Sequence, residues 1–141
     1  MQLAQSDDGT SITYETHGSG GLKLILLHGW GGSSSYWRDL VSHLNLKGLP
    51  IIAPSYRGHG DSDKPVTGYT LDGFAKDVLA VADAVGAQRF VLVGFSMSGK
   101  FAQYITALNP TCTWTRAHRP CSSQRVSGSC RRRESVVRHP A

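Results

Sequence analysis

The sequence lacks the features that carry a protein out of the cytoplasm or into a membrane. Its start, MQLAQSDDGT, has neither the charged region nor the apolar region of a secretory signal. Its longest aliphatic run, Leu24 to Leu27, is much shorter than the ~20 residues that a helix needs to cross a bilayer. Asn109-Pro110-Thr111 has proline in the middle and is no glycosylation acceptor. These absences predict a cytoplasmic protein, and 141 residues predict one domain at most.

A second set of absences divides the chain after Pro110. Residues 111–141 contain no Leu, Ile, Met, Phe, Tyr, Lys or Asp, while they hold seven Arg and all three cysteines. Burying so little apolar surface would not offset the conformational entropy that the segment loses when it becomes ordered. We therefore expect a globular part over 1–110 and a disordered Arg/Ser/Cys-rich tail over 111–141. The net charge of +5 comes from this tail, because residues 1–110 hold eight Lys and Arg against nine Asp and Glu.

The tail has no pattern that indicates a ligand. Cys112, Cys121 and Cys130 form no C-x-x-C pair, which argues against a zinc site. Arg131 to Arg133 is basic, but Trp114 is the only tail aromatic that can stack on a base, which argues against nucleic-acid binding. We expect no metal and no cofactor. The abrupt change in composition favours the hypothesis that the tail is foreign to the fold, as reading of a GC-rich gene out of frame would produce. A splice variant with a genuine tail is the alternative.

Chemistry-bearing residues gather in the stretch from Arg89 to Pro110. The apolar run Phe90 to Val93 is typical of a strand buried on both faces. The turn Gly94 to Gly99 follows, and then apolar residues at helical spacing run up to Pro110. Ser96 lies on this turn, where a hydroxyl is lifted clear of the sheet and the N-terminus of a helix favours developing negative charge.

The same residues permit a second interpretation. Gly94 to Lys100 matches G-x-x-x-x-G-K, the loop that binds phosphates in nucleotide-binding proteins. That motif continues with Ser or Thr, whose hydroxyl binds magnesium, whereas this chain has Phe101. An apolar ring cannot ligate a hard cation, so a nucleotide-binding protein is the weaker alternative.

Strand and helix patterns alternate through the rest of residues 11–110. Strands are predicted over Ser11 to Thr16, near the sheet edge, over Leu22 to Leu27 and over Leu49 to Ala53. Helical spacing indicates one helix around residues 36–44 and a longer one over Tyr69 to Gly86. This order predicts an α/β fold with a mostly parallel, doubly wound sheet.

Three motifs occur in one order: His28-Gly29-Trp30-Gly31-Gly32, the loop Pro54 to Ser62, and the turn around Ser96. Together they resemble the N-terminal part of the α/β-hydrolase superfamily, of the serine esterase or haloperoxidase-like type. The usual turn is G-x-S-x-G, and Ser98 stands here in place of the last glycine. Ser55 stands where the family's second loop commonly has Asp.

The resemblance implies a role for each matching residue. Ser96 would be the nucleophile that attacks a small ester or other acyl substrate. The backbone N–H groups of Trp30 and Met97 would form the oxyanion hole, with His28, Gly29 and Gly94 supporting the two loops. A serine at this position argues against the related epoxide hydrolases, which place Asp there.

The family supplies its triad acid and histidine after the nucleophile. The tail offers only Glu134 and His139 in that order, with no strands to hold them in place. We therefore expect a truncated fold, a missing base and acid, and weak or no turnover; a non-catalytic fragment that binds a ligand or partner is the alternative. Arg57, His59 and Asp61 are interpreted as loop-fixing or solvated groups rather than as a catalytic cluster.

Overall fold

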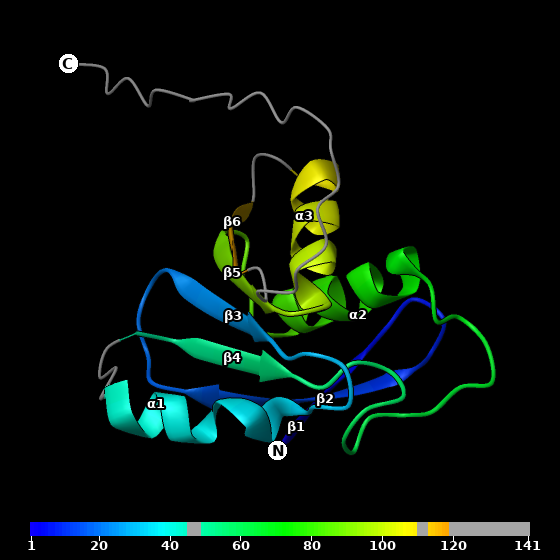
Figure 1. The fold of residues 1–141 in the computed structure, drawn as a ribbon, viewed down its shortest axis with the longest axis horizontal. Coiled ribbons are helices and arrows are strands. Elements are labelled where there is room, and N and C mark those ends of the chain that lie inside the picture. The colour runs from blue at the N-terminus through cyan, green and yellow to red at the C-terminus, as the bar shows by residue number, and fades with distance from the viewer. Residues whose placement is uncertain (45–48, 110–112, 119–141) are drawn as a thin grey trace, which may run out of the picture.

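A mixed six-stranded sheet runs through the part of the chain that the computed structural model describes, residues 1–44, 49–109 and 113–118 (Figure 1). The strands are β1 (Gln2–Gln5), β2 (Ser11–His17), β3 (Lys23–Leu27), β4 (Ile51–Pro54), β5 (Phe90–Phe95) and β6 (Thr113–His118). The helices are the 3₁₀ turn η1 (Ser34–Trp37), α1 (Arg38–Leu44), α2 (Leu71–Ala84) and α3 (Ser98–Leu108).

The strand order is β1-β2-β4-β3-β5-β6. β1 to β2 and β2 to β4 pair antiparallel, whereas β4, β3, β5 and β6 are mutually parallel. The predicted α/β class is confirmed, and each predicted strand is present. The strand predicted over Ser11 to Thr16 lies near the sheet edge, as expected, with one unpredicted strand, β1, pairing outside it. The four residues QLAQ of β1 are too few for a strand pattern to be recognised.

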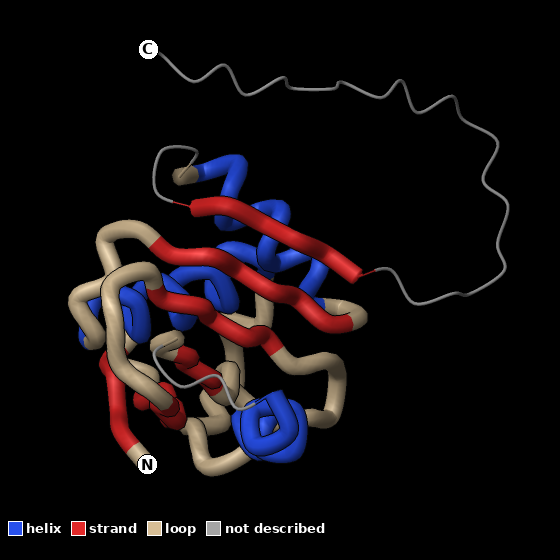
Figure 2. Tube along the Cα trace, turned by 90° about the vertical axis from the view of Figure 1, so that its left-hand side faces the viewer, coloured by secondary structure: helices blue, strands red, loops and turns tan. Residues whose placement is uncertain are grey.

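β4 is buried on both faces, whereas β5, predicted to be buried on both, is buried on the face of Phe90 and Leu92 and only half-buried at Val91 and Val93 on the other. Ile25 and Leu27 of β3 belong to one apolar cluster with α2 and α3, while Leu26 between them belongs to a second cluster with Trp37. Successive side chains of a strand point to opposite faces. The chain therefore places α2 and α3 on one face and η1 with α1 on the other, as Figure 2 shows.

Aromatic packing fixes α3 beside α2. The Thr70 hydroxyl caps α2 by accepting from the Gly73 N–H at 3.0 Å, as the sequence predicted. Phe74 of α2 and Phe101 of α3 stack with ring centroids 4.6 Å apart, and both are buried. Phe101, the residue that breaks the phosphate-loop motif, is thus a core side chain.

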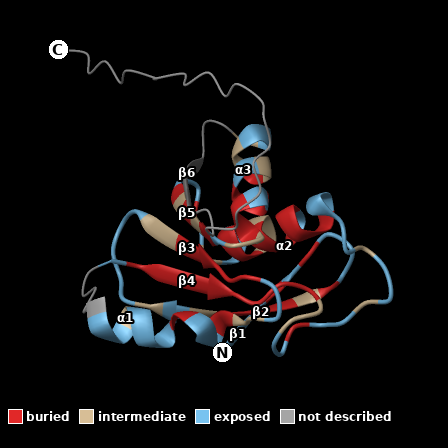
Figure 3. Ribbon diagram, viewed as in Figure 1, coloured by how far each residue is buried: buried red, intermediate tan, exposed pale blue. Residues whose placement is uncertain are grey.

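The opposite face is less fully covered. β4 is buried along its whole length, whereas most of α1 is exposed, including Leu40 (Figure 3). Across residues 1–44, 49–109 and 113–118, no helix has both the length and the apolar character that a bilayer span requires.

Strand β6 was not predicted, because no strand pattern was found in the sequence after residue 110. β6 pairs parallel with β5 from Phe90↔Thr113 to Phe95↔His118. Its sequence, TWTRAH, has no long aliphatic side chain, so the apolar-run criterion missed it, although threonine and tryptophan favour strands. Residues 119–141, which we expect to be disordered, lie outside the described part of the chain. The boundary at residue 110 between the globular part and the tail stays a prediction.

Candidate functional site

Three loops meet at one edge of the sheet because three parallel strands end there. In the pairing of β3 with β5, Leu27 lies opposite Gly94, and β4 runs parallel on the other side of β3. His28, Tyr56 and Ser96 each follow directly or closely after one of these strand ends. Loops at the carboxyl ends of parallel strands are where α/β proteins bind ligands.

Ser96 has the backbone conformation of a tight, strained turn. Its φ is +56°, and among the described residues it is the one non-glycine with positive φ. Such a conformation costs on the order of 1–3 kcal/mol and persists only where the surrounding structure imposes it. The Gly99 N–H donates to the Ser96 carbonyl at 3.1 Å, so α3 begins immediately after the turn.

Gly94 allows this turn to close. A Cβ at position 94 would collide with the Ser98 carbonyl group and would lie 2.8 Å from the Gly99 nitrogen. Any side chain there would push the end of β5 away from the start of α3. The predicted supporting role of Gly94 therefore has a steric basis.

Gly29 brings the second loop against the first. A Cβ at position 29 would lie 3.3 Å from the Ser96 Cβ and 3.1 Å from Cδ1 of Phe95. These are tight contacts, so a glycine is what lets the backbone of the His28–Gly32 loop approach Ser96 closely. The two loops that the sequence singled out are direct neighbours.

His28 is fully buried and holds the Gly29–Trp30 peptide. Its Nδ1–H donates to the Gly29 carbonyl oxygen at 2.8 Å, and its Nε2 accepts from the Tyr56 N–H at 3.4 Å. The Gly29 oxygen also accepts from the Gly32 N–H at 3.1 Å. Burial, helped by the nearby His59, lowers the pKa of His28 to about 4, although the bond to the Gly29 carbonyl acts in the opposite direction. The imidazole is therefore neutral near pH 7, with both nitrogens engaged.

A second buried connection ties α3 to the same loop. The Tyr56 hydroxyl donates to Ser98 Oγ at 2.7 Å, and Ser98 Oγ donates to the His28 carbonyl oxygen. Tyr56 and Ser98 are both fully buried. Burial raises the pKa of Tyr56 well above its usual value, which keeps its hydroxyl a donor. Sequence reasoning did not single out Tyr56; Ser98 in place of glycine was the available signal.

The loop after β4 is held by a buried cation. Arg57 is 1% exposed and pairs with Asp77 of α2 and with Asp8, each at 2.7 Å. His59 Nδ1 lies 3.1 Å from the Arg57 carbonyl oxygen, and Asp61 is exposed. Arg57 thus fixes the loop, as predicted, but in a buried ion pair rather than as a solvated group.

A hollow of about 400 Å³ opens beside this edge of the sheet. The indole of Trp30, which is 78% exposed, and the rings of His59 and Tyr69 line it, together with Lys64 and four glycines of the two loops. The indole of Trp30 meets His59 edge-on at a centroid distance of 5.7 Å. The hollow therefore adjoins the loop that carries the Trp30 amide.

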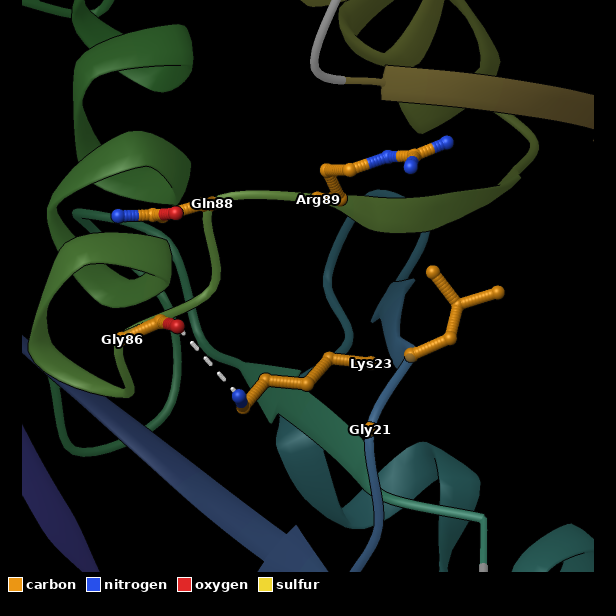
Figure 4. A pocket seen from close by; sticks show the side chains of 6 residues that line it. Gly21, Lys23, Gly86, Gln88 and Arg89 are labelled. Carbon is orange, nitrogen blue, oxygen red and sulfur yellow. Dashed lines mark hydrogen bonds between the residues drawn. The ribbon is translucent and has the colours of Figure 1, made fainter.

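A larger cavity of about 520 Å³ lies at the opposite edge of the sheet, by the amino ends of β3 and β5 (Figure 4). The Lys23 ammonium reaches the Gly86 carbonyl oxygen at 3.5 Å, while the Arg89 side chain extends to another side. The two cations do not converge, and Ser96 lies at the other ends of these strands. Size alone does not make this cavity the site.

Within the described residues, no three His, Cys, Asp or Glu side chains gather as metal ligands would. The tail residues considered as candidates from the sequence lie outside the described part of the chain: Glu134, His139 and the three cysteines. The side chains in contact at the strand ends are those of His28, Tyr56, His59 and Ser98, and Ser96 lies next to this group across Gly29.

Comparisons with known proteins agree with this geometry. Residues 24–112 match the family described as alpha/beta hydrolase fold. A non-heme chloroperoxidase from Streptomyces lividans is 35% identical over 112 residues, which are 78% of this chain and 41% of the relative. A soluble epoxide hydrolase from Corynebacterium sp. (strain C12) is 37% identical over 97 residues, 69% of this chain and 33% of the relative.

Solved structures give the same result. An esterase from Rhodococcus sp. ECU1013 superposes with a TM-score of 0.73 at 38% identity, covering 79% of this chain and 42% of the esterase. The chain thus spans about two fifths of the length of proteins that it resembles. The match over residues 24–112, with the strained serine turn and the adjoining glycine loop, establishes that this chain belongs to the α/β-hydrolase fold family.

Proposed function

We propose that Ser96 is the nucleophile of an acyl-transfer reaction and that the chain carries the nucleophile half of a serine esterase site. The observation that carries the proposal is the φ of +56° at Ser96, between a buried strand and a helix. Strain of this kind is retained where a side chain must be presented to a ligand. A plain turn at this position would adopt an unstrained conformation.

In this proposal the Ser96 oxygen adds to the carbonyl carbon of an ester, its proton passes to solvent water, and the carbonyl oxygen becomes an oxyanion. When the oxyanion collapses, the ester's alcohol oxygen leaves and takes a proton from water, and the acyl group stays on Ser96. The Met97 N–H and the Trp30 N–H would donate to that oxygen. Met97 follows Ser96 at the N-terminus of α3, where the free N–H groups favour negative charge. Gly29 keeps the Trp30 loop in contact with Ser96.

The general base of this reaction is not His28. Both of its ring nitrogens are engaged, with the Gly29 oxygen and the Tyr56 N–H, and it is fully buried. We propose that the family's acid and histidine are absent from residues 1–109. Without a base the hydroxyl is a weak nucleophile, although an oxyanion hole and substrate binding alone retain roughly 10³-fold acceleration over water. We therefore expect slow acylation and slower turnover.

The hollow beside Trp30 supports a small substrate. It has a volume of about 400 Å³, adjoins the Trp30 loop rather than Ser96 itself, and is lined by three aromatic rings and Lys64, which suits a small ester with an aromatic or short aliphatic group. Relatives include an esterase and an epoxide hydrolase; a serine in the nucleophile position favours the esterase chemistry for this chain.

The experiment is to incubate the full chain with p-nitrophenyl acetate and to record its intact mass. We expect a slow increase of one acetyl group that maps to the peptide containing Ser96 and is absent from Ser96→Ala. Folding of both proteins is checked by circular dichroism. A folded chain that gains no acetyl group at Ser96 contradicts the proposal and favours a non-catalytic binding role.

A further inference from the structure

The serine that replaces a glycine at position 98 has a structural consequence of its own. A glycine there would leave the Tyr56 hydroxyl without the acceptor it has now, and the His28 carbonyl without the Ser98 donor. Ser98 Oγ accepts from Tyr56 at 2.7 Å and donates to the His28 carbonyl oxygen. Its hydroxyl is fully buried, so water does not compete for either bond.

Tyr56 thereby holds two groups of His28, its imidazole ring and its backbone carbonyl. The Tyr56 N–H donates to the imidazole Nε2 at 3.4 Å, and the Tyr56 hydroxyl acts through Ser98 on the His28 carbonyl. Tyr56 itself is fixed among rings, with its centroid 5.3 Å from Phe101 and 5.5 Å from Phe74. The hydrogen-bonded chain therefore starts from a rigid anchor.

The next peptide is the one that carries the Trp30 N–H. Its carbonyl, that of Gly29, accepts from His28 Nδ1 at 2.8 Å and from the Gly32 N–H at 3.1 Å. The described chain has no cis peptide bond, so the Trp30 N–H points opposite to that carbonyl. Whatever fixes His28 fixes the direction of the Trp30 N–H.

We propose that Ser98 is a positioning residue. By holding the His28 carbonyl it orients the Trp30 N–H, and this N–H is one of the two donors of the proposed oxyanion hole. The effect of Ser98 on the acetylation rate rests on the proposed acyl-transfer function. The effect of Ser98 on the direction of the Trp30 N–H does not depend on that function. Ser98 is not a second nucleophile, because its hydroxyl is buried and engaged on both sides.

The test uses the full chain, three variants of the Tyr56–Ser98 connection and one control variant. Ser98→Ala removes the bond from Ser98 to the His28 carbonyl. Tyr56→Phe removes the bond from the Tyr56 hydroxyl to Ser98 and keeps the bond from Ser98 to His28. The double variant Tyr56→Phe/Ser98→Ala loses both without leaving a tyrosine hydroxyl unpaired. Ser6→Ala is the matched control, because Ser6 is also buried and bonded, at 3.3 Å to Arg57, but lies away from the His28 loop.

Two readouts are measured on each protein: the acetylation rate of Ser96 by p-nitrophenyl acetate, and the Trp30 amide signal in a nitrogen-15 NMR spectrum. We expect Ser98→Ala and the double variant to acetylate about 10- to 100-fold more slowly, the range for a misplaced oxyanion donor. We expect their Trp30 amide to shift and to broaden by exchange. Tyr56→Phe should slow acetylation less than Ser98→Ala does, because it removes the anchor of Ser98 but keeps the bond from Ser98 to His28. Ser6→Ala should stay within about threefold of the parent rate.

The outcomes separate the two proposals. An unchanged Trp30 amide in folded Ser98→Ala overturns the positioning role, and so does a parent-like acetylation rate in that variant. If the parent chain is not acetylated but its Trp30 amide responds to Ser98→Ala, the proposed function fails and the positioning of the amide holds.

Discussion

Arg57 and Asp77 form a two-bonded ion pair in the interior, with Nε 2.9 Å from Oδ2 and Nη2 2.7 Å from Oδ1. Arg57 is 1% exposed and Asp77 is fully buried. The pair joins the loop after β4 to the middle of α2. Since that loop also supplies Tyr56 and His59, the ion pair positions one wall of the candidate site.

Removing one charge of this pair should destabilise the fold strongly. Asp77→Asn keeps the shape but leaves the guanidinium with only Asp8 as an ionic partner, and an uncompensated buried charge costs about 3–5 kcal/mol. We expect the free energy of unfolding in urea to fall by about 3 kcal/mol. Asp61→Asn, on the exposed part of the same loop, should change it by less than about 0.5 kcal/mol. Equal effects of the two variants would contradict this account.

Gly94 should tolerate no side chain. In Gly94→Ala the added Cβ meets the Ser98 carbonyl group, so β5 and α3 must separate, and we expect a loss of about 1–3 kcal/mol in thermal or urea unfolding. Gly21→Ala is the control, because nothing lies within 4 Å of a Cβ there. A fully stable Gly94→Ala would show that the turn is looser than described.

The strain at Ser96 should be measurable as stability. Ser96→Gly relieves the positive φ, whereas Ser96→Ala keeps it. We expect the glycine variant to unfold with a free energy about 1 kcal/mol higher than the alanine variant, since strain of 1–3 kcal/mol is partly offset by the entropy of glycine. The pair is compared by urea denaturation. The opposite order would mean that the turn is not strained.

Acid should weaken the fold through His28. Its pKa is lowered from 6.5 to about 4 in the folded state, so the unfolded chain binds the proton more readily between these values. This stabilisation is complete above pH 6.5 and is lost as the pH falls towards 4, by roughly 3 kcal/mol in total. Protonation would also turn Nε2 into a donor facing the Tyr56 N–H.

The measurement is the free energy of unfolding at several pH values from 7 to 4, for the parent and for His28→Gln. The slope between pH 6.5 and 4 should be smaller in His28→Gln. His43→Gln, at an exposed position of α1, should retain the parent slope. Identical slopes in all three proteins would exclude His28 as the titrating group.

Much of the fold could be predicted because its signals are local. The apolar runs before His28 and Ser96, and the turn residues after them, define strands β3 and β5 and the two loops that meet. Contacts between distant residues could not be predicted in this way. The pairing of Arg57 with Asp77 and the Tyr56–Ser98–His28 connection join positions 20 to 70 residues apart and leave no periodic pattern.

Strand β6 shows the limit of composition as a guide. Thr113–His118 has no aliphatic run, yet it pairs along the whole of β5, because an exposed parallel edge offers a full row of backbone partners. Ser98 shows the opposite case. Its departure from G-x-S-x-G was visible in the sequence, but its two bonding partners became known only from the fold.

The most direct test of the central claim is to treat the folded full chain with a fluorophosphonate probe and to locate the adduct by peptide mass spectrometry. Ser96→Ala and the urea-unfolded chain are the controls. The account predicts an adduct on Ser96 in the folded parent and in neither control. A folded parent without an adduct, or with equal adducts on other serines, would contradict the assignment of Ser96 as the nucleophile.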